Sequence, residues 1–348
     1  MTAIQPMKSE RTEAQPATET ADIAGIAKSP QSPRPDHAPP PGYLRLLETG
    51  ELAERARLLD AMQSPCALCP RRCGVDRKSG RTGVCGADHR PKIAAASIHM
   101  WEEPPITGTR GSGTIFFSGC TLQCIFCQNY PISQLGAGRT LAPEELARQM
   151  LRLQKRGAHN INLVTPTHQA PAFVQALLVA ASEGLRIPIV YNTSGYESVE
   201  ALRLLEGIVD VYLPDVKYDS DEAARLCSRR SDYVAHNRAA LLEMWRQVGP
   251  IRTDAEGLAY RGMLVRHMVL PDNLAGSEKC FEFLAREIGP DVWVSLMNQY
   301  FPAYKALQIP PLDRKTTSDE YESAFEALER LGLHNGFVQE CDGAPEGE

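Results

Sequence analysis

Seven of the ten cysteines fall between Cys66 and Cys127, in two tight groups, and the other three are dispersed at Cys227, Cys280 and Cys341. The N-terminus has scattered charges without an apolar core, which is not typical of a secretory signal. Disulfides seldom persist in the reducing cytoplasm, so thiols that cluster in a cytoplasmic protein indicate metal or redox chemistry rather than a disulfide framework. We therefore expect each group to serve a metal or redox centre.

The composition is that of an ordinary globular protein. Of the 348 residues, 43% are hydrophobic and 23% charged, which suffices for a sizeable core. No apolar run approaches the roughly 20 residues needed to cross a bilayer. The net charge of -6 argues against a non-specific nucleic-acid binder, because such proteins carry a basic surface. We expect a soluble, cytoplasmic protein with neither a nucleic-acid nor a membrane partner.

The first 41 residues differ from the rest of the chain. Residues 1–41 hold eight of the 26 prolines and no aromatic residue. Such a segment buries too little apolar surface to offset its ordering entropy, so we expect it to be disordered. A helix is predicted over Leu44–Met62, before the first cysteine group.

From Gly113 onward, short β-rich runs alternate with helical patterns. The predicted strands are Thr114–Ser118, Asn160–Thr165, Ile187–Asn192, Val209–Pro214, Met263–Leu270 and Val292–Met297. The predicted helices are Pro143–Arg156, Pro171–Glu183, Ser198–Leu205, a stretch within Asp221–Val248, and Ser277–Ile288. Six strands alternating with helices require parallel pairing and right-handed crossovers. An eight-fold barrel takes about 250 residues, so the shorter span here favours an α/β fold with a partial (β/α)6 TIM-like barrel. A doubly wound sheet is the alternative, and in both folds ligands gather at the carboxyl ends of the strands.

The second cysteine group forms one short loop directly after the first predicted strand. Cys120, Cys124 and Cys127 are spaced by four and then three residues, so a single loop can aim three thiolates at one point. Cysteine thiolates are the usual ligands of iron–sulfur clusters, commonly four per cluster. Three ligands leave one iron open, and an open position is what a catalytic metal requires. A structural zinc normally has four protein ligands and fits this loop less well.

This CxxxCxxC spacing, with the aromatic Phe126 before the last cysteine, resembles the signature of the radical S-adenosylmethionine superfamily. Further segments resemble the activators of glycyl-radical proteins, in the subgroup labelled PflX or pyruvate formate-lyase activating enzyme-like: Gly111–Thr114, Val164–His168, Tyr191–Tyr196, Tyr212–Lys217, Val265–Pro271 and Ser295–Tyr300. The resemblance runs from Cys66 to Pro302. It implies an oxidoreductase with a [4Fe-4S] cluster on Cys120, Cys124 and Cys127, which together form the catalytic centre.

In that superfamily, the open iron chelates S-adenosylmethionine, whose reductive cleavage gives methionine and a 5′-deoxyadenosyl radical. The subgroup implies that this radical abstracts hydrogen from a glycine of a glycyl-radical protein. It also implies an electron donor of the flavodoxin or ferredoxin type. A radical enzyme that acts on another peptide or a small molecule is the alternative. A non-catalytic iron–sulfur electron carrier is a third hypothesis, which the open coordination position disfavours.

The polar residues at the strand ends are the candidate contacts to the cofactor. Where relatives use a Gly-Gly-Glu-Pro type of turn to bind the amino group, this chain has Thr-Pro-Thr-His instead. A salt pair between Asp215 and Lys217 is the structural alternative for those two residues. Since side chains alternate along a strand, one of Arg266 and His267 points into the barrel and the other outward. The candidates are Thr165, Thr167, His168, Asn192, Ser194, Asp215, Lys217 and Arg266, with a weaker signal at Asn298 and Gln299.

The first cysteine group makes a complete ligand set by itself. Cys66, Cys69, Cys73 and Cys85 combine two short spacings with glycine turns. Four thiolates suit a closed structural zinc, and they suit an auxiliary [4Fe-4S] cluster equally well. Both metals stay open at this point. The chain is thus predicted to consist of a tail over 1–41, a helix with this metal module over 42–110, the radical core over 111–305, and an extension with one helix over 306–348.

Overall fold

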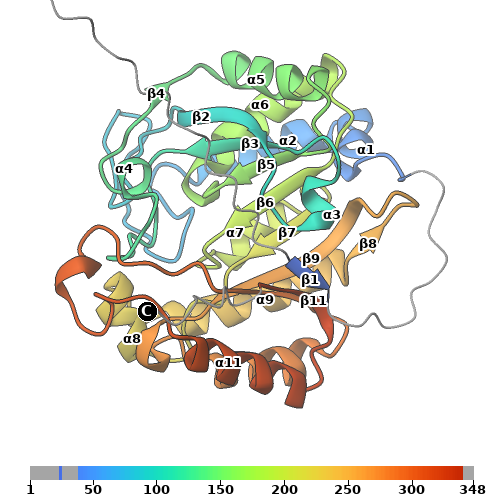
Figure 1. Ribbon diagram of the computed structural model, residues 1–348. Coiled ribbons are helices and arrows are strands. Elements are labelled where there is room, and N and C mark those ends of the chain that lie inside the picture. Colours follow the sequence, from blue (N-terminus) through green and yellow to red (C-terminus); the bar gives the residue numbers. More distant parts are fainter. Residues whose placement is uncertain (1–22, 26–37, 340–348) are drawn as a thin grey trace, which may run out of the picture.

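A computed structural model describes residues 23–25 and 38–339, in which helices surround a single sheet (Figure 1). The strands are β1 (Ile23–Gly25), β2 (Lys92–His99), β3 (Ser112–Phe117), β4 (Arg139–Thr140), β5 (Ile161–Val164), β6 (Ile189–Thr193), β7 (Val211–Pro214), β8 (Arg252–Thr253), β9 (Ala259–Met268), β10 (Trp293–Met297) and β11 (Asn335–Gln339). The α-helices are α1 (Gly42–Glu48), α2 (Glu51–Ala61), α3 (Pro104–Thr107), α4 (Tyr130–Ser133), α5 (Pro143–Lys155), α6 (Ala170–Ser182), α7 (Val199–Leu204), α8 (Asp221–Ser228), α9 (Tyr233–Val248), α10 (Ser277–Phe283) and α11 (Ser318–Arg330). Short helical turns complete the fold: η1 (Thr167–Gln169), η2 (Pro271–Asn273), η3 (Leu284–Ile288) and η4 (Ala306–Gln308).

The sheet is an open barrel built around a parallel run. Its order is β1-β11-β10-β9-β7-β6-β5-β3-β2-β4, with β8 paired to β9. Every pair from β3 to β11 in this order is parallel. The parallel strands follow one another in chain order without the reversal that defines a doubly wound sheet. Among the described strands, those at the two ends of the order do not pair, so the predicted partial TIM-like barrel is confirmed, with β11 as a seventh parallel strand beside the six that were predicted.

The six predicted strands correspond to β3, β5, β6, β7, β9 and β10, with ends that shift by up to four residues. The sequence analysis missed β11, which extends the parallel run, and the antiparallel edge formed by β2 and β4. Of the predicted helices, the amphipathic pattern of α5 is confirmed, since Leu146, Met150 and Leu153 are buried. Glu145 accepts a hydrogen bond from the backbone N–H of Ala142 at 2.9 Å, which helps to fix where α5 begins.

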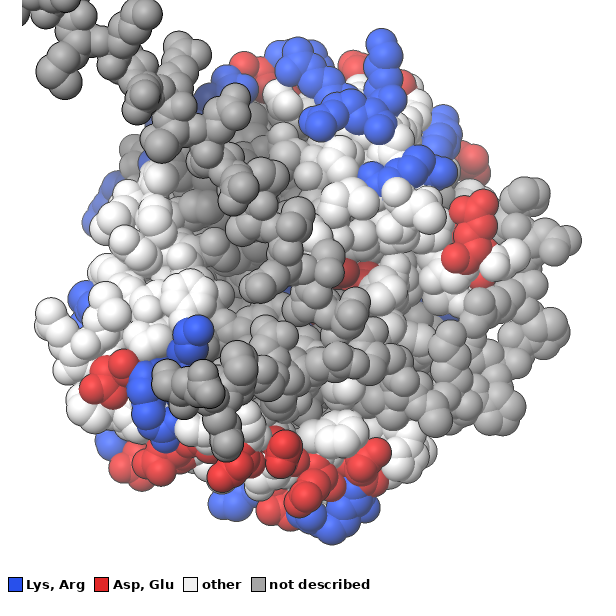
Figure 2. All heavy atoms as spheres, in the orientation of Figure 1, with Lys and Arg blue, Asp and Glu red and all other residues white. Residues whose placement is uncertain are grey.

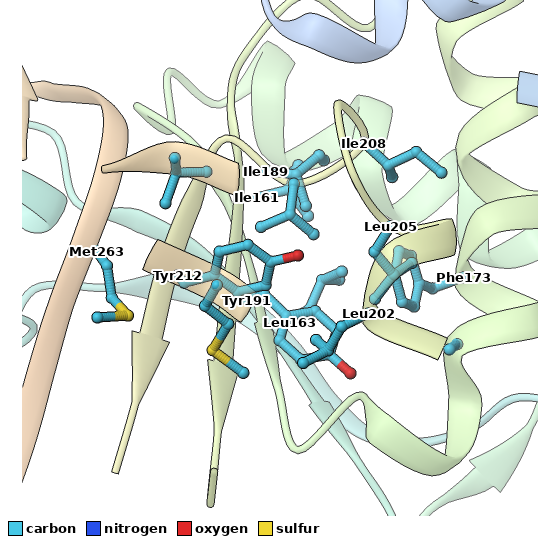
Figure 3. Packing of buried hydrophobic residues seen from close by; sticks show 14 of the residues in the cluster. Ile161, Leu163, Phe173, Ile189, Tyr191, Leu202, Leu205, Ile208, Tyr212 and Met263 are labelled. Atoms are coloured by element: carbon cyan, nitrogen blue, oxygen red, sulfur yellow. The ribbon is translucent and has the colours of Figure 1, made fainter. Parts of the chain in front are cut away.

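Alternate strand residues face opposite sides of the sheet, and the helices α5, α6, α7 and α9 pack against one of these sides. Figure 3 shows Leu163, Tyr191 and Tyr212 packed toward Phe173 of α6 and toward α7. The Tyr191 ring lies 6.1 Å from that of Phe173 and 5.8 Å from that of Tyr212, between centroids. A second buried cluster, which includes Val190 and Ile106, fills the inside of the barrel near the amino ends of the strands. The interior toward the carboxyl ends is thereby left for polar side chains.

Two of the predicted helices are divided. Leu44–Met62 forms α1 and α2, because Gly50 adopts a left-handed conformation with φ 78° between them. Asp221–Val248 forms α8 and α9, because Arg229 ends α8 in a left-handed conformation with φ 54°. Arginine carries no signal for such a break, so the sequence pattern, which placed one longer helical stretch within this range, did not locate it.

The N-terminal part of the chain is only partly described. Residues 1–22 and 26–37 of the predicted disordered tail lie outside the described residues, as does Cys341. Ile23–Gly25 forms β1 and pairs with β11. The open edge of β11 offers the backbone groups for this pairing. Disorder of residues 1–41 stays a prediction. The division into four regions stays a prediction.

The surface carries charges of both signs. Figure 2 shows Lys and Arg side chains near the top of the view, where α5 lies in Figure 1, and mixed charges along the lower edge, where α11 lies. Where this view shows described residues, acidic and basic side chains are interspersed. Among the helices of the described residues, none is long and apolar enough to span a membrane.

Candidate active site

The three-cysteine loop turns at the carboxyl end of β3, as predicted. It begins at Gly119, whose φ is 85°; a Cβ there would overlap the carbonyl oxygen of Cys85. Glycine is thus required on both conformational and steric grounds. The far side of the loop is anchored at Ile125, whose N–H donates to the carbonyl of Cys227 at 2.8 Å and whose own carbonyl accepts the N–H of Lys305 at 3.0 Å. The loop is therefore held between β3, α8 and the segment after β10.

The thiols of this loop are withdrawn from solvent. Cys120 and Cys124 are buried and Cys127 is partly buried. Burial raises the pKa of the Cys120 thiol to about 12, and it also raises the pKa of Cys127, with the neighbouring Cys124 adding to both shifts. Such thiols stay protonated at neutral pH unless a bound cation favours the thiolates. The loop is thus suited to metal ligation rather than to free-thiolate chemistry.

Each sulfur of the loop has a polar hydrogen-bond partner. The backbone N–H of Leu122 donates to Sγ of Cys120 at 3.4 Å, and the hydroxyl of Ser228 donates to Sγ of Cys124 at 3.1 Å. Ser133 Oγ lies 3.1 Å from Sγ of Cys127. Hydrogen bonds to ligating sulfurs tune the potential of an iron–sulfur cluster. Donors in these positions suit sulfurs that carry negative charge.

A cavity of about 450 Å³ opens onto the loop. All three cysteines line it, and no fourth cysteine does so among the described residues. The side of the three thiols on which no further cysteine lies therefore faces the cavity. The opposite wall comes from the ends of β5, β6, β7 and β9, and includes six of the eight predicted contacts: Thr165, Asn192, Ser194, Asp215, Lys217 and Arg266. Gln299 also lines the cavity.

Thr165 stands out among these residues by its backbone. Its φ is 57°, which is rare for a β-branched residue and costs on the order of 1–3 kcal/mol. Strain of this kind persists where surrounding structure enforces it, most often at functional sites. Here the backbone N–H of Thr165 donates to the carbonyl of Asn192 at 2.9 Å, which ties the ends of β5 and β6 together.

The structure places Thr167 and His168 behind the cavity wall. Thr167 donates a hydrogen bond to the buried carboxyl of Glu197. His168 Nε2 lies 2.7 Å from the carbonyl oxygen of Ser118, and burial lowers the pKa of His168 to about 4, so the ring is neutral. These two side chains support the end of β3 and the loop, and they do not reach the cavity.

The charged residues of the wall are paired with one another. Lys217 Nζ lies 2.6 Å from Oδ2 of Asp215, so the salt pair considered from the sequence does form, inside the cavity. Arg266 Nε lies 3.1 Å from Oε1 of Glu103, and Nη1 lies 3.6 Å from Oε2 of Glu102. Neither glutamate was predicted from the sequence, because both follow the unpredicted strand β2.

His267 is the outward member of the strand pair with Arg266. It is fully buried, with Nδ1 2.8 Å from the carbonyl oxygen of Val216 and Nε2 2.9 Å from Oγ of Ser277. Burial lowers the pKa of His267 to about 4. The ring is therefore a satisfied, neutral part of the packing against α10, while Arg266 points inward as the alternation predicts.

Comparisons with known proteins bear directly on this loop and cavity. The chain is 31% identical to the uncharacterized protein MJ0674 of Methanocaldococcus jannaschii over 278 residues, which cover 77% of this chain and 75% of that protein. It is 23% identical to the uncharacterized protein MJ0808 of the same organism over 280 residues, or 74% and 77% of the two chains. Residues 114–251, which hold the cysteine loop, match the model of the Radical SAM superfamily. The chain belongs to the radical SAM superfamily.

Membership implies a radical SAM enzyme that uses a [4Fe-4S] cluster and S-adenosylmethionine. The residues present fit both groups. Three buried thiols with hydrogen-bond partners lie on one loop, and their open side faces a cavity whose volume suits one drug-sized ligand. Among the described residues, no three Cys, His, Asp or Glu side chains stand together as ligands of a single metal ion. A cluster needs no such grouping, since each thiolate binds its own iron.

The four amino-terminal cysteines also come together, in turns between α2 and β2. A Cβ at Gly83 would lie 2.9 Å from Sγ of Cys73 and 3.9 Å from Sγ of Cys85, so these two thiols flank one glycine. Burial raises the pKa of Cys69 to about 12 and raises that of Cys66, and other thiols of the group contribute to both shifts. The four predicted ligands thus form one neighbourhood, which we call the cysteine module.

Ser228, the hydroxyl donor to Cys124, provides a first test of the loop. The sequence had not indicated that this helical residue contacts a cluster ligand. Replacing Ser228 with alanine removes the hydroxyl donor to Cys124. Loss of one hydrogen bond of about 1 kcal/mol should make the cluster potential about 40 mV more negative, because the donor favours the more negative, reduced state. Redox titration followed by electron paramagnetic resonance measures this shift. Ser182→Ala, on α6, is the control; an unchanged potential in Ser228→Ala would show that the hydroxyl does not act on the bound sulfur.

Glu197 is a second residue that sequence reasoning missed. Burial raises its pKa to about 7, although hydrogen bonds from Thr167, Thr193 and Tyr191 oppose the shift. Between pH 4.5, the pKa of Glu197 in the unfolded chain, and about pH 7, the folded state therefore binds a proton that the unfolded state does not bind. The free energy of unfolding consequently decreases as the pH rises through this window.

Glu197→Gln should accordingly weaken the pH dependence of folding. Between about pH 6 and pH 8, the wild type should lose about 1.4 kcal/mol of unfolding free energy that the variant keeps. Asp210, whose pKa burial also raises to about 7, is present in both proteins and cancels in the comparison. Anaerobic urea unfolding at the two pH values gives the difference. Parallel pH profiles would mean that Glu197 is ionised throughout.

Proposed function

We propose that this radical SAM enzyme abstracts a hydrogen atom from a glycine of a protein substrate. The observation that carries the proposal is a set of exposed apolar side chains at, or close in sequence to, residues that line the cavity. Trp101 lines the cavity and is 67% exposed, and Met100 beside it is 45% exposed. Leu135 and Phe301, both exposed, follow the cavity-lining residues Ser133 and Gln299. Exposed apolar side chains gathered around a functional cavity are typical of a protein-binding surface.

The size of the cavity also favours a substrate that enters from outside. Its volume of about 450 Å³ is at the lower end of the range for pockets that enclose one ligand. The cofactor alone would occupy most of this space. A protein loop needs to insert only one residue past the rim, whereas a second large ligand would need a cavity of its own. The segments that resemble glycyl-radical activators support the same conclusion.

Roles follow for the residues of the site. When bound, the cluster and S-adenosylmethionine supply one-electron cleavage of a carbon–sulfur bond and a radical that abstracts hydrogen. Cys120, Cys124 and Cys127 hold the cluster. Thr165, Asn192 and Ser194 orient the polar groups of the cofactor. The Asp215–Lys217 pair offers one charge of each sign, which suits a ligand that carries both an amino group and a carboxylate. The buried walls exclude water, which protects a reactive radical.

Asp215→Asn tests these contacts separately from the cluster. The variant should bind S-adenosylmethionine about tenfold more weakly, because a charged partner worth roughly 1.4 kcal/mol is lost. Asn192→Ala should act in the same direction. Neither residue touches a cysteine of the loop, so cluster content should not change. A titration of the cluster signal with S-adenosylmethionine measures the affinity. Asp291→Asn, at an exposed position, is the control, and wild-type affinity in both site variants would remove them from the cofactor site.

Isotope transfer identifies the substrate. Pyruvate formate-lyase, or another glycyl-radical protein, would be prepared with deuterated glycine and mixed anaerobically with the enzyme, S-adenosylmethionine and a reductant. Hydrogen abstraction from glycine places deuterium in 5′-deoxyadenosine and leaves a carbon-centred radical on the partner. Unlabelled 5′-deoxyadenosine with every glycyl-radical protein, together with wild-type cofactor cleavage, would favour the radical enzyme that modifies another peptide or a small molecule. The proposal includes a cytoplasmic location and an electron donor of the flavodoxin or ferredoxin type.

A further inference from the structure

We propose that Cys66, Cys69, Cys73 and Cys85 hold a second iron–sulfur cluster, and that this cluster delivers electrons to the one on the Cys120–Cys127 loop. The inference rests on the proposed function only in one respect, which is that the delivered electron is used to cleave S-adenosylmethionine. It assigns the cysteine module a metal and a role in the reaction. Three features carry it: the spacing of the ligands, their arrangement, and their contact with the catalytic loop.

The spacing of the module is that of a cluster-binding loop. Three cysteines, Cys66, Cys69 and Cys73, lie within eight residues, and the fourth follows at Cys85. Iron–sulfur sites commonly take three ligands from one loop and the fourth from a more distant position. Zinc sites with four cysteines are typically built from two separate C-x2-C pairs. Here Cys66 and Cys69 form one such pair, but Cys73 and Cys85 do not form another.

The arrangement of the thiols agrees with the spacing. Four sulfurs that bind one zinc ion at 2.3 Å would lie about 3.8 Å from one another. Among the described residues, no three potential ligands stand together around one ion, in the cysteine module or elsewhere. The thiols of Cys73 and Cys85 both lie within 3.9 Å of the Cβ position at Gly83. The thiols of the catalytic loop likewise form no single-ion group, and a cluster does not require one, because each thiolate binds its own iron.

The module is in direct contact with the catalytic loop. Arg71 Nε donates to the carbonyl of Thr121, and Arg71 Nη2 donates to that of Leu122 at 3.4 Å. In the other direction, Gln123 Nε2 donates to the carbonyl of Val84 at 2.5 Å. Gly119, next to Cys120, packs against the carbonyl of Cys85 so closely that no side chain fits between them. Val84 and Thr121 each adjoin a cysteine ligand, so this contact joins the two ligand groups.

Figure 1 shows the same relation at the level of the chain. The blue loops that follow α2 lie on the side of α4, which itself follows the cysteine loop. Electron tunnelling falls exponentially with distance, so a redox centre at this place would exchange electrons with the catalytic cluster faster than one elsewhere on the surface. A purely structural zinc would need no contact with the loop that is reduced.

The outer face of the module suits a protein donor. Cys73 and Arg81 are exposed, so the module reaches the surface. Residues 66–90 contain six Lys and Arg but two Asp, in a chain whose net charge is -6. Some of these charges are paired, as Arg72 is with Glu200 at 2.9 Å. The net basic character still favours an acidic donor, because complementary charge speeds encounter.

The electron balance is simple. A reduced low-potential donor protein, which carries a flavin or an iron–sulfur centre, gives one electron to the oxidised cluster of the module and is itself oxidised by one electron. The module returns to its oxidised state as it passes this electron to the cluster on Cys120, Cys124 and Cys127. That electron is then available for the cleavage of the carbon–sulfur bond of S-adenosylmethionine, which forms methionine.

Metal analysis of the intact protein tests the first half of the proposal. Anaerobically reconstituted wild type should contain about eight irons per chain, four for each cluster, without zinc. Full reduction should give two cluster signals broadened by magnetic interaction, since the centres are adjacent. Serine at Cys66, Cys69, Cys73 and Cys85 should lower the iron to about four and leave the signal that responds to S-adenosylmethionine. About four irons and one zinc in the wild type would overturn the inference while leaving the radical SAM activity intact.

Donor dependence tests the second half. With a reduced flavodoxin as donor, the four-serine variant should lose most 5′-deoxyadenosine formation, whereas dithionite, a small reductant, should restore it. Arg81→Glu keeps all ligands and should slow reduction by flavodoxin about tenfold while leaving both clusters in place. Lys279→Glu, at another exposed cation, on α10, is the control. A four-serine variant that flavodoxin reduces at the wild-type rate would overturn the relay. If that variant does not fold, the wild-type metal content and Arg81→Glu decide.

Discussion

Replacing Cys120, Cys124 and Cys127 together with alanine should abolish the cluster that responds to S-adenosylmethionine, and cofactor cleavage with it. The three thiols are the only cysteines that line the cavity among the described residues, so no other thiolate can replace them there. Loss of the ligands removes the metal itself, which makes this the largest effect expected for any change in the chain. Electron paramagnetic resonance of the reduced protein, with and without S-adenosylmethionine, measures the loss.

The control for this experiment is Cys280→Ala. Cys280 is also buried, on α10; its sulfur lies 3.5 Å from the carbonyl oxygen of Ala275, and it does not line the cavity. That variant should keep the response to the cofactor. A response that persists in the triple variant would mean that the catalytic cluster is bound elsewhere, and the assignment of the loop would be wrong.

Gly119→Ala should cause the second largest effect. The left-handed backbone costs a non-glycine residue about 1–2 kcal/mol. The added Cβ would also overlap the carbonyl oxygen of Cys85, so the loop and the cysteine module must move apart. We expect a total destabilisation of about 3 kcal/mol or more, with low cluster content, because the contact lies between both ligand groups. Anaerobic unfolding and iron analysis measure the two consequences.

Gly257→Ala separates the two causes. Gly257 has φ 84°, close to that of Gly119, but nothing lies within 4 Å of its Cβ position. This control should therefore lose only the backbone contribution of about 1–2 kcal/mol and keep its iron. Equal effects of the two substitutions would show that the contact between the module and the loop does not stabilise the protein.

The sequence predicted those parts of the fold that depend on local periodicity. The alternation of six strands with helices led to the partial barrel, since parallel strands need crossovers and the span was too short for eight units. The division of the predicted helices was missed at Gly50 and at Arg229. A left-handed turn at arginine is set by tertiary context and leaves no pattern in the sequence.

The residues of the candidate site also differ in whether the sequence could predict them. The cysteine loop and the strand-end residues were predictable, because spacing and position at the carboxyl ends of strands are local properties. Glu197, Ser228 and Glu102 were not, since each acts through a neighbour distant in the sequence. Burial of Thr167 and His168 behind the wall has the same origin: the turn η1 directs them toward β3 and Glu197, which a motif cannot show.

Formation of 5′-deoxyadenosine is the measurement that tests the radical SAM assignment most directly. Reconstituted wild-type protein, with dithionite and S-adenosylmethionine under anaerobic conditions, should form 5′-deoxyadenosine and methionine in equal amounts, slowly even without a substrate. The triple alanine variant of the loop should form neither. A wild-type protein that carries its cluster and binds S-adenosylmethionine, yet forms no 5′-deoxyadenosine with any partner, would contradict the account and identify the chain as an iron–sulfur electron carrier.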